Sequence, residues 1–181
     1  MSSSRDKLDS LYVIFRGMIR EEIDQTPGFR ELTGSSELPA SVDAERTIIG
    51  AIMLDNAALD QTKEIKPDDY SLDSHRRIFL AMNQLKDAGS TIDIVTLSNH
   101  LGEDGCKEIG GVAYLASLTE GLPRHLVTVD YIAIVKEKAK LRSIIGGCEA
   151  AIKACMEQQV AAADIVGGLG VALKGIRKVG K

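Results

Sequence analysis

The chain has 181 residues, of which 44% are hydrophobic and 27% charged, and its formal net charge at pH 7 is −4. A chain of this length and composition buries roughly 70% of its unfolded surface, so it holds a core of its own and is not disordered. The acidic balance argues against a cationic protein that wraps nucleic acid. No apolar run reaches the roughly 18 residues of a membrane span, and the first ten residues lack the apolar core of a secretory signal. We expect a cytoplasmic protein without membrane contact.

Cysteine and histidine patterns predict no metal site, no cofactor and no catalytic residue. The three cysteines, Cys106, Cys148 and Cys155, form no C-x-x-C pair, which favours a reducing compartment over a zinc site or a disulfide framework. Cys148 and Cys155 are expected to be small core residues. The histidines are not at metal-binding spacing, and a surface or capping role is expected for His75 and His125.

Apolar residues recur at helical spacing almost everywhere, which predicts an all-α protein. The first predicted helix covers residues 6–24 and has one apolar stripe: Leu8, Leu11, Tyr12, Phe15, Ile19 and Ile23. Breakers follow it at Pro27, Gly28 and 33–41. Residues 1–37 are therefore predicted to be an N-terminal amphipathic helix with a linker.

Residues 38–125 are predicted to form a small helical globule. Ser41 is a candidate N-cap for a helix that buries Ile48, Ile49, Ile52 and Leu54, and a short helix at 56–65 follows, ended by Pro67. The next helix is expected to begin with a cap at Asp73 or Ser74 and to end at Gly89, with a stripe of Ile78, Ala81, Met82 and Leu85. Asp93 caps a helix that runs to Leu101 and is closed by Gly102 and Gly105. The last helix carries Val112, Leu115 and Leu118 and stops at Gly121 and Pro123.

Residues 126–181 are predicted to form an antiparallel helical hairpin. The first helix has about 30 residues and a stripe at alternating spacings of four and three: Val127, Tyr131, Ile134, Lys138, Leu141, Ile145, Cys148, Ile152 and Cys155. The second helix carries Ala162, Val166, Leu169, Leu173 and Ile176 at the same spacings. Such a hairpin exposes more apolar surface than it buries, so we expect it to pair with a second copy. The predicted interface residues are Tyr131, Ile134, Leu141, Ile145, Cys148, Ile152, Val166, Leu169, Leu173 and Ile176.

Two other features bear on function. The ending from Gly175 to Lys181 matches G-x-x-x-x-G-K, but a phosphate loop needs a preceding strand and a following helix, so we interpret the match as coincidence and predict no ATPase. Basic side chains on the hairpin are candidate contacts for single-stranded DNA: Lys136, Lys140, Arg142, Lys174, Arg177 and Lys178.

Five segments of the chain carry a family resemblance through their order and spacing. They are LPASVDAERTIIGAIMLDN (38–56), HRRIFLAMNQL (75–85), TIDIVTLSNHL (91–101), IGGVAYLASL (109–118) and YIAIVKEKAKLRSII (131–145). Together they resemble the N-terminal domain of the DnaB-type replicative DNA helicases. The resemblance covers 38–158, extends more loosely over 160–179 and does not include residues 1–37.

The resemblance implies a helical globule followed by a hairpin, without the RecA-like motor that hydrolyses ATP in this family. It implies a non-catalytic collar domain that assembles from dimers to hexamers through its hairpins and docks primase in DNA replication. Other helicase subunits are the further expected partners. The alternative is a stand-alone regulator that binds the helicase or single-stranded DNA.

Overall fold

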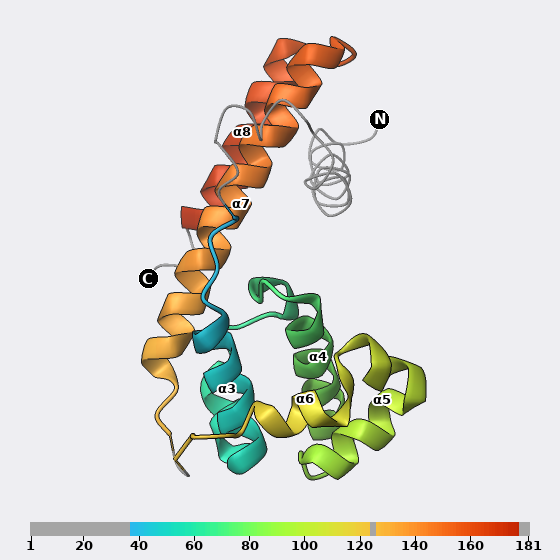
Figure 1. Cartoon of the computed structure of the whole chain (residues 1–181). Coiled ribbons are helices and arrows are strands. Elements are labelled where there is room, and N and C mark those ends of the chain that lie inside the picture. The colour runs from blue at the N-terminus through green and yellow to red at the C-terminus, as the bar shows by residue number, and fades with distance from the viewer. Residues whose placement is uncertain (1–36, 124–125, 178–181) are drawn as a thin grey trace. The chain divides into compact units, whose positions relative to one another are not determined.

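The computed structural model describes residues 37–123 and 126–177, with side chains up to Leu173 in the last helix. Within these ranges every regular element is a helix, which confirms the all-α class (Figure 1). The described residues divide into a globular unit, Pro39–Ala139, and a hairpin unit that contains Lys140 onwards together with Glu37 and Leu38. The predicted helix at 6–24 lies outside the described residues.

Helix α3, Val42–Leu54, places three isoleucines in the centre of the globular core: Ile48, Ile49 and Ile52. Ser41 occupies the N-cap position as predicted, but its side chain makes no capping hydrogen bond. Gly50 is buried on the same helix, and a Cβ atom there would lie 2.2 Å from the carbonyl oxygen of Leu118. The close approach of that backbone explains a glycine in a helix interior, where it costs about 1 kcal/mol relative to alanine.

Two 3-10 helices, η1 (Asn56–Thr62) and η2 (Pro67–Asp69), lead into helix α4, Asp73–Asp87. The predicted cap at Asp73 or Ser74 is wrong, because Leu72 is the N-cap and Asp73 Oδ2 instead accepts from Arg77 Nε at 2.6 Å. The predicted end at Gly89 is confirmed. This residue has a φ of +69°, and the N–H groups of Gly89 and Ser90 donate to the carbonyls of Lys86 and Leu85.

Helices α5, Ile94–Glu108, and α6, Gly111–Ser117, complete the short helices of the globule. Asp93 caps α5 as predicted, since its carboxylate accepts from Thr96 N–H at 2.8 Å. The predicted end of this helix after Leu101 is confirmed, because Gly102 has a φ of +70° and interrupts the helical geometry. A second helical stretch follows it up to Glu108, so Gly105 does not close the element. Leu115 is buried on α6 and Leu118 is buried just after it, whereas Val112 of the same helix is half exposed.

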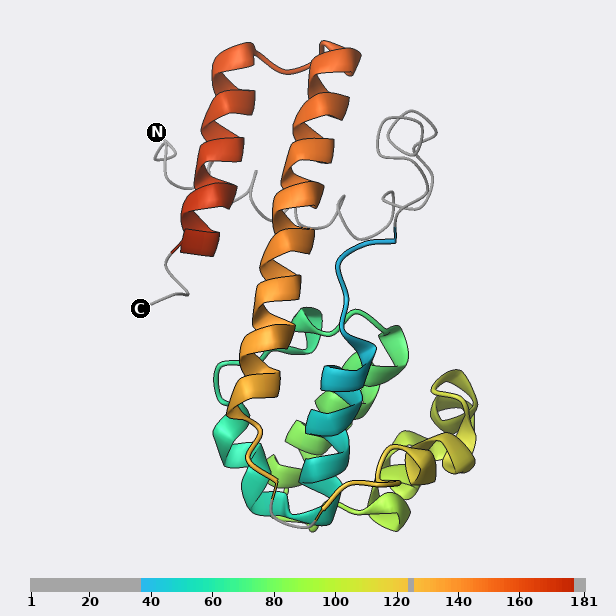
Figure 2. The same cartoon turned by 60° about the vertical axis from the view of Figure 1, so that its left-hand side comes forward.

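Helices α7, Val129–Glu157, and α8, Ala162–Arg177, form the predicted antiparallel hairpin (Figure 2). The beginning of α7 belongs to the globular unit, where Ile132 and Val135 join the core and Thr128 and Ala139 are buried beside them. Each of these buried residues comes one position after a residue of the predicted apolar stripe. Tyr131 is therefore half-buried, and Ile134 is exposed.

Candidate functional site

The two helices of the hairpin pack through small side chains. Gly147 on α7 is buried, and a Cβ atom there would lie 3.8 Å from both Ala172 Cβ and Leu169 Cδ1 of α8. Ala151 on α7 and Ile165 on α8 are each only 8% exposed. The two helices therefore approach each other closely at Gly147, and the buried Ala151 and Ile165 are the other inward positions.

The large side chains gather on one side of the hairpin. Cys148 and Ile152 each follow a residue of α7 that packs inward, and Val166 and Leu173 each follow such a residue of α8. A step of one residue turns a side chain by about 100° in the same sense along both helices. Because the helices are right-handed and antiparallel, these two stripes lie on the same side. We call this surface the apolar hairpin face: Leu141, Ile145, Cys148, Ile152, Val166, Leu169 and Leu173.

The apolar hairpin face is open over much of its area. Ile152 is 51% exposed, Val166 71% and Leu173 41%, while Ile145, Cys148 and Leu169 are half-buried in the middle. All seven residues belong to the predicted interface. Of the other predicted members, Tyr131 and Ile134 lie on the part of α7 that belongs to the globular unit, and the side chain of Ile176 lies outside the described residues.

The candidate nucleic-acid contacts are not gathered into one described basic patch. Lys136 lies in the globular unit, where its ammonium group donates to Asp69 Oδ2 at 3.1 Å and to the Glu64 carbonyl at 2.8 Å. Lys140 and Arg142 are half-buried on α7. The side chains of Lys174 and Arg177, and all of Lys178, lie outside the described residues, so the predicted contact stays a prediction. Of the G-x-x-x-x-G-K ending, the described residues 175–177 belong to helix α8.

A carboxylate of the hairpin has an unusual environment. Glu149 on α7 has a buried oxygen, Oε2, without a hydrogen-bond partner. Burial raises the pKa of this carboxyl group. Burial disfavours the charged form of the carboxyl group, which accounts for the direction of this shift.

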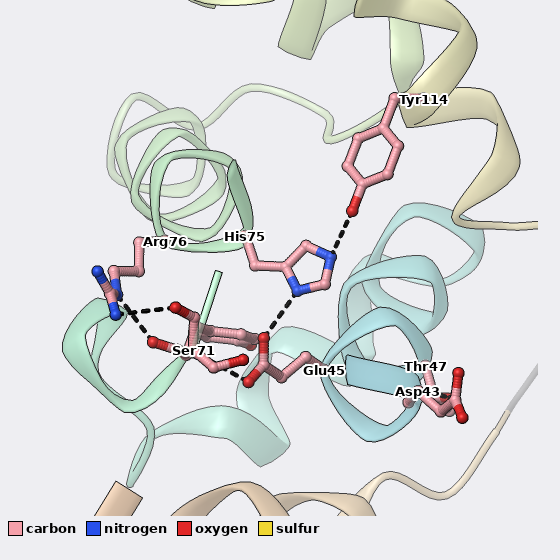
Figure 3. A network of polar contacts seen from close by, with 8 residues as sticks. Asp43, Glu45, Thr47, Ser71, His75, Arg76 and Tyr114 are labelled. Carbon is pink, nitrogen blue, oxygen red and sulfur yellow. Dashed lines mark hydrogen bonds and ion pairs between the residues drawn. The ribbon is translucent and has the colours of Figure 1, made fainter. Parts of the chain in front are cut away.

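A buried polar network joins three helices of the globule (Figure 3). Glu45 of α3 is 1% exposed and His75 of α4 is fully buried. Glu45 Oε2 lies 2.8 Å from His75 Nδ1, and the hydroxyl oxygen of Tyr114 on α6 lies 2.8 Å from His75 Nε2. An imidazole with its proton on Nδ1 donates to Glu45 and accepts from Tyr114, so one tautomer satisfies both contacts.

Backbone and side-chain groups complete the network around Glu45. The Ser71 N–H donates to Glu45 Oε1 at 2.7 Å, and the Arg76 guanidinium donates to the carbonyls of Tyr70 and Ser71. Burial acts to raise the pKa of Glu45, but hydrogen bonds from His75 and Ser71 outweigh it and lower the pKa below its usual value. Burial also raises the pKa of Tyr70. Since Glu45 and His75 are both enclosed, we interpret the network as a structural tie between α3, α4 and α6.

Sequence reasoning missed this network. His75 was expected at the surface or as a cap, and the structure contradicts that expectation because the ring is fully buried. A signal was present in the spacing: Glu45 precedes Ile48 by three residues, and His75 precedes Ile78 by three, so each polar residue continues an apolar stripe. The core position predicted for Cys155 is also wrong, since this side chain is exposed.

The globule and hairpin define an all-helical domain with exposed apolar side chains on the hairpin. A family model, the DnaB-like helicase N terminal domain, matches residues 37–137, more than half of the chain. The chain belongs to this family. No helix of the described part is long and apolar enough to cross a membrane.

Relatives and solved structures agree with this assignment. The chain is 39% identical over 109 residues to the replicative DNA helicase DnaB of Geobacillus stearothermophilus, and 37% identical over 109 residues to the replicative DNA helicase DnaC of Bacillus subtilis. Each match covers 59% of this chain and 24% of the relative, so the chain spans about a quarter of the curated relatives it matches.

The fold is similar to that of the N-terminal domain of DnaB helicase from Mycobacterium tuberculosis. The TM-score is 0.71 at 24% identity, and the match covers 77% of this chain and 99% of that one. A second similar structure is described as a DnaB-like replicative helicase and its interactions with primase, with a TM-score of 0.62 at 19% identity. It covers 75% of this chain and 31% of that one.

Proposed function

We propose that this chain acts as a non-catalytic collar domain of a replicative DNA helicase, in the cytoplasm, and that it self-associates through the apolar hairpin face and docks primase. The observation that carries the proposal is the open apolar face on the hairpin of a chain that belongs to the DnaB N-terminal domain family. The family match covers the non-motor part of a helicase, which supports a role without ATP hydrolysis.

Self-association follows from the energetics of the apolar hairpin face. Fully burying a side chain the size of leucine or isoleucine is worth about 1.5–3 kcal/mol. In the described part of the chain, Ile152, Val166 and Leu173 are 51%, 71% and 41% exposed. A two-fold interface uses the same patch on both copies. Two hairpins that pair in this way therefore bury these three residues on each of the two chains. Dimers that associate further would form the hexameric collar.

The double variant Ile152→Asp, Leu173→Asp is expected to convert the assembly to monomers. Each change places a carboxylate in the centre of the proposed interface, where an unpaired charge is costly to bury, so we expect dimer affinity to fall at least about 100-fold. Light scattering after size exclusion, across a range of concentrations, measures the mass. The matched control is Val171→Asp, because Val171 precedes an inward-packing residue of α8 and lies on the other side of the hairpin, 38% exposed. An unchanged mass of the double variant would refute the interface.

Primase docking is supported by the similar structure of a DnaB-like helicase described with its interactions with primase. We expect immobilised primase to retain the wild-type chain and the Val171→Asp control, and to lose at least about tenfold in affinity for the double variant, because the docking surface depends on paired hairpins. Surface plasmon resonance measures this affinity. Wild-type affinity of the monomeric double variant would show that primase binds elsewhere.

The alternative role, a regulator that binds the helicase or single-stranded DNA, stays a prediction.

A further inference from the structure

The apolar hairpin face and the N-terminal segment of the chain have complementary properties. The face is a two-helix surface on which Ile152, Val166 and Leu173 are exposed in the described part of the chain. The N-terminal segment 6–24 carries six large apolar residues on one predicted helical stripe and lies outside the family match. We propose that residues 6–24 dock on the apolar hairpin face of their own chain as a third helix, and that they compete there with a second copy.

The lengths of the partners agree. The hairpin part of α7, residues 140–157, is about 27 Å long, and α8 is about 24 Å long, at 1.5 Å per residue. A helix over 6–24 would be about 28 Å long. A third helix of this length covers the apolar hairpin face from one end to the other.

The chain connection is long enough for the segment to reach this surface. Glu37 and Leu38, the first described residues, belong to the hairpin unit and not to the globule. Residues 25–36 separate them from the predicted helix, and twelve extended residues span up to about 40 Å. This exceeds the length of either hairpin helix, so the linker allows docking in either direction along the face.

The chemistry of the segment favours this occupant. A helix with Leu11, Phe15 and Ile19 on one side and Ser10 on the other must bury its apolar stripe against another element. A hairpin with one open apolar side supplies such an element, and the product is a three-helix bundle with a closed core. Because the segment is tethered, its effective concentration at the face reaches the millimolar range, so a free second copy competes at a disadvantage.

Photocrosslinking in the full chain tests the docking. Phe15→p-benzoylphenylalanine is expected to link within one chain to peptides of 140–157 or 162–173, read by mass spectrometry of the monomer band. The matched control is the same replacement at Ser10, on the opposite side of the predicted helix, which is expected to link at least about fivefold less. Links to residues 39–139, links between chains, or equal yields at both positions would overturn the proposal.

Competition between residues 6–24 and a second copy is tested by the dimer dissociation constant, and this test rests on the proposed self-association. Phe15→Asp, Ile19→Asp should uncover the face, so the dimer dissociation constant should fall at least about tenfold relative to wild type, with Ser10→Asp unchanged. An unchanged or larger dissociation constant would overturn the competition. If wild type and variant are both monomeric at all concentrations, the proposed assembly fails, while the crosslink at position 15 still decides whether the segment docks.

Discussion

Replacing Gly50 by valine is expected to lower the free energy of unfolding of the globular unit by about 3 kcal/mol. The first added atom, Cβ, would lie 2.2 Å from the Leu118 carbonyl oxygen and 2.5 Å from Leu122 Cδ1. The first of these neighbours is backbone, which a rotamer change cannot move away. The chain after α6 must therefore shift away from α3, and the contacts of Leu118 with the core are lost with it.

Urea denaturation followed by circular dichroism measures this change. The control is Gly167→Ala on α8, where a Cβ atom meets nothing within 4 Å. This change is expected to stabilise the hairpin by about 0.5–1 kcal/mol through helix propensity alone. Gly50→Ala should destabilise despite the same gain in propensity. A stabilising Gly50→Ala would show that the end of α6 does not press on α3 in solution.

Glu45→Ala is the second change with a large expected effect, a loss of about 3 kcal/mol. It removes both oxygens of a carboxylate that is 1% exposed, and so leaves His75 Nδ1 and the Ser71 N–H without their acceptors inside the globule. Three helices lose a common tie, since His75 also contacts Tyr114 of α6. Chemical denaturation at neutral pH measures the loss.

The matched control is Glu103→Ala on α5. Its carboxylate lies 2.8 Å from Lys107 Nζ, as short a contact as the buried one, but its side chain is 86% exposed. We expect a change within about 0.5 kcal/mol, because solvent screens an exposed pair. A similar loss in both variants would contradict the special weight given to the buried network.

The same network predicts an acid-sensitive globule. The pKa of Glu45 is lower in the native state than its usual value of 4.5, so its stabilising contribution is present above about pH 4.5 and is lost as the pH falls through the native pKa. Stability of the wild type should therefore decline below that pH more steeply than stability of Glu45→Gln, in denaturation series between pH 7 and pH 3. Parallel curves would contradict this assignment.

Local signals predicted the helices because they depend on neighbours in the chain. The Asp93 cap and the Gly89 stop were correct, since each uses hydrogen bonds within a few residues. Ser41 and Asp73 carry the same kind of signal and do not cap. Whether a residue caps a helix depends on its backbone angles at the helix N-terminus. Those angles depend on the direction from which the preceding segment enters, and contacts elsewhere in the globule fix that direction.

Helix α7 shows the same limit for a long element. The apolar spacing predicted one stripe along its whole length, but its beginning buries the neighbouring positions Ile132, Val135 and Ala139 instead. The predicted set there includes Lys138 but is otherwise apolar, and both sets have helical spacing, so periodicity alone does not choose between them. The globular core contacts one set, and the predicted set remains available on the hairpin part of the helix.

The amino-acid sequence by itself determined the all-α class, the globule followed by a hairpin and the family, because helical periodicity, breakers and the order of segments are properties of the chain alone. Only the tertiary structure decided why Gly50 is a glycine, that Glu45 and His75 are buried partners, and which side of the hairpin stays open. These features depend on contacts between segments that are far apart in the sequence. Glu45 becomes buried against His75, and Gly50 loses the space for a Cβ atom, only when those segments pack together.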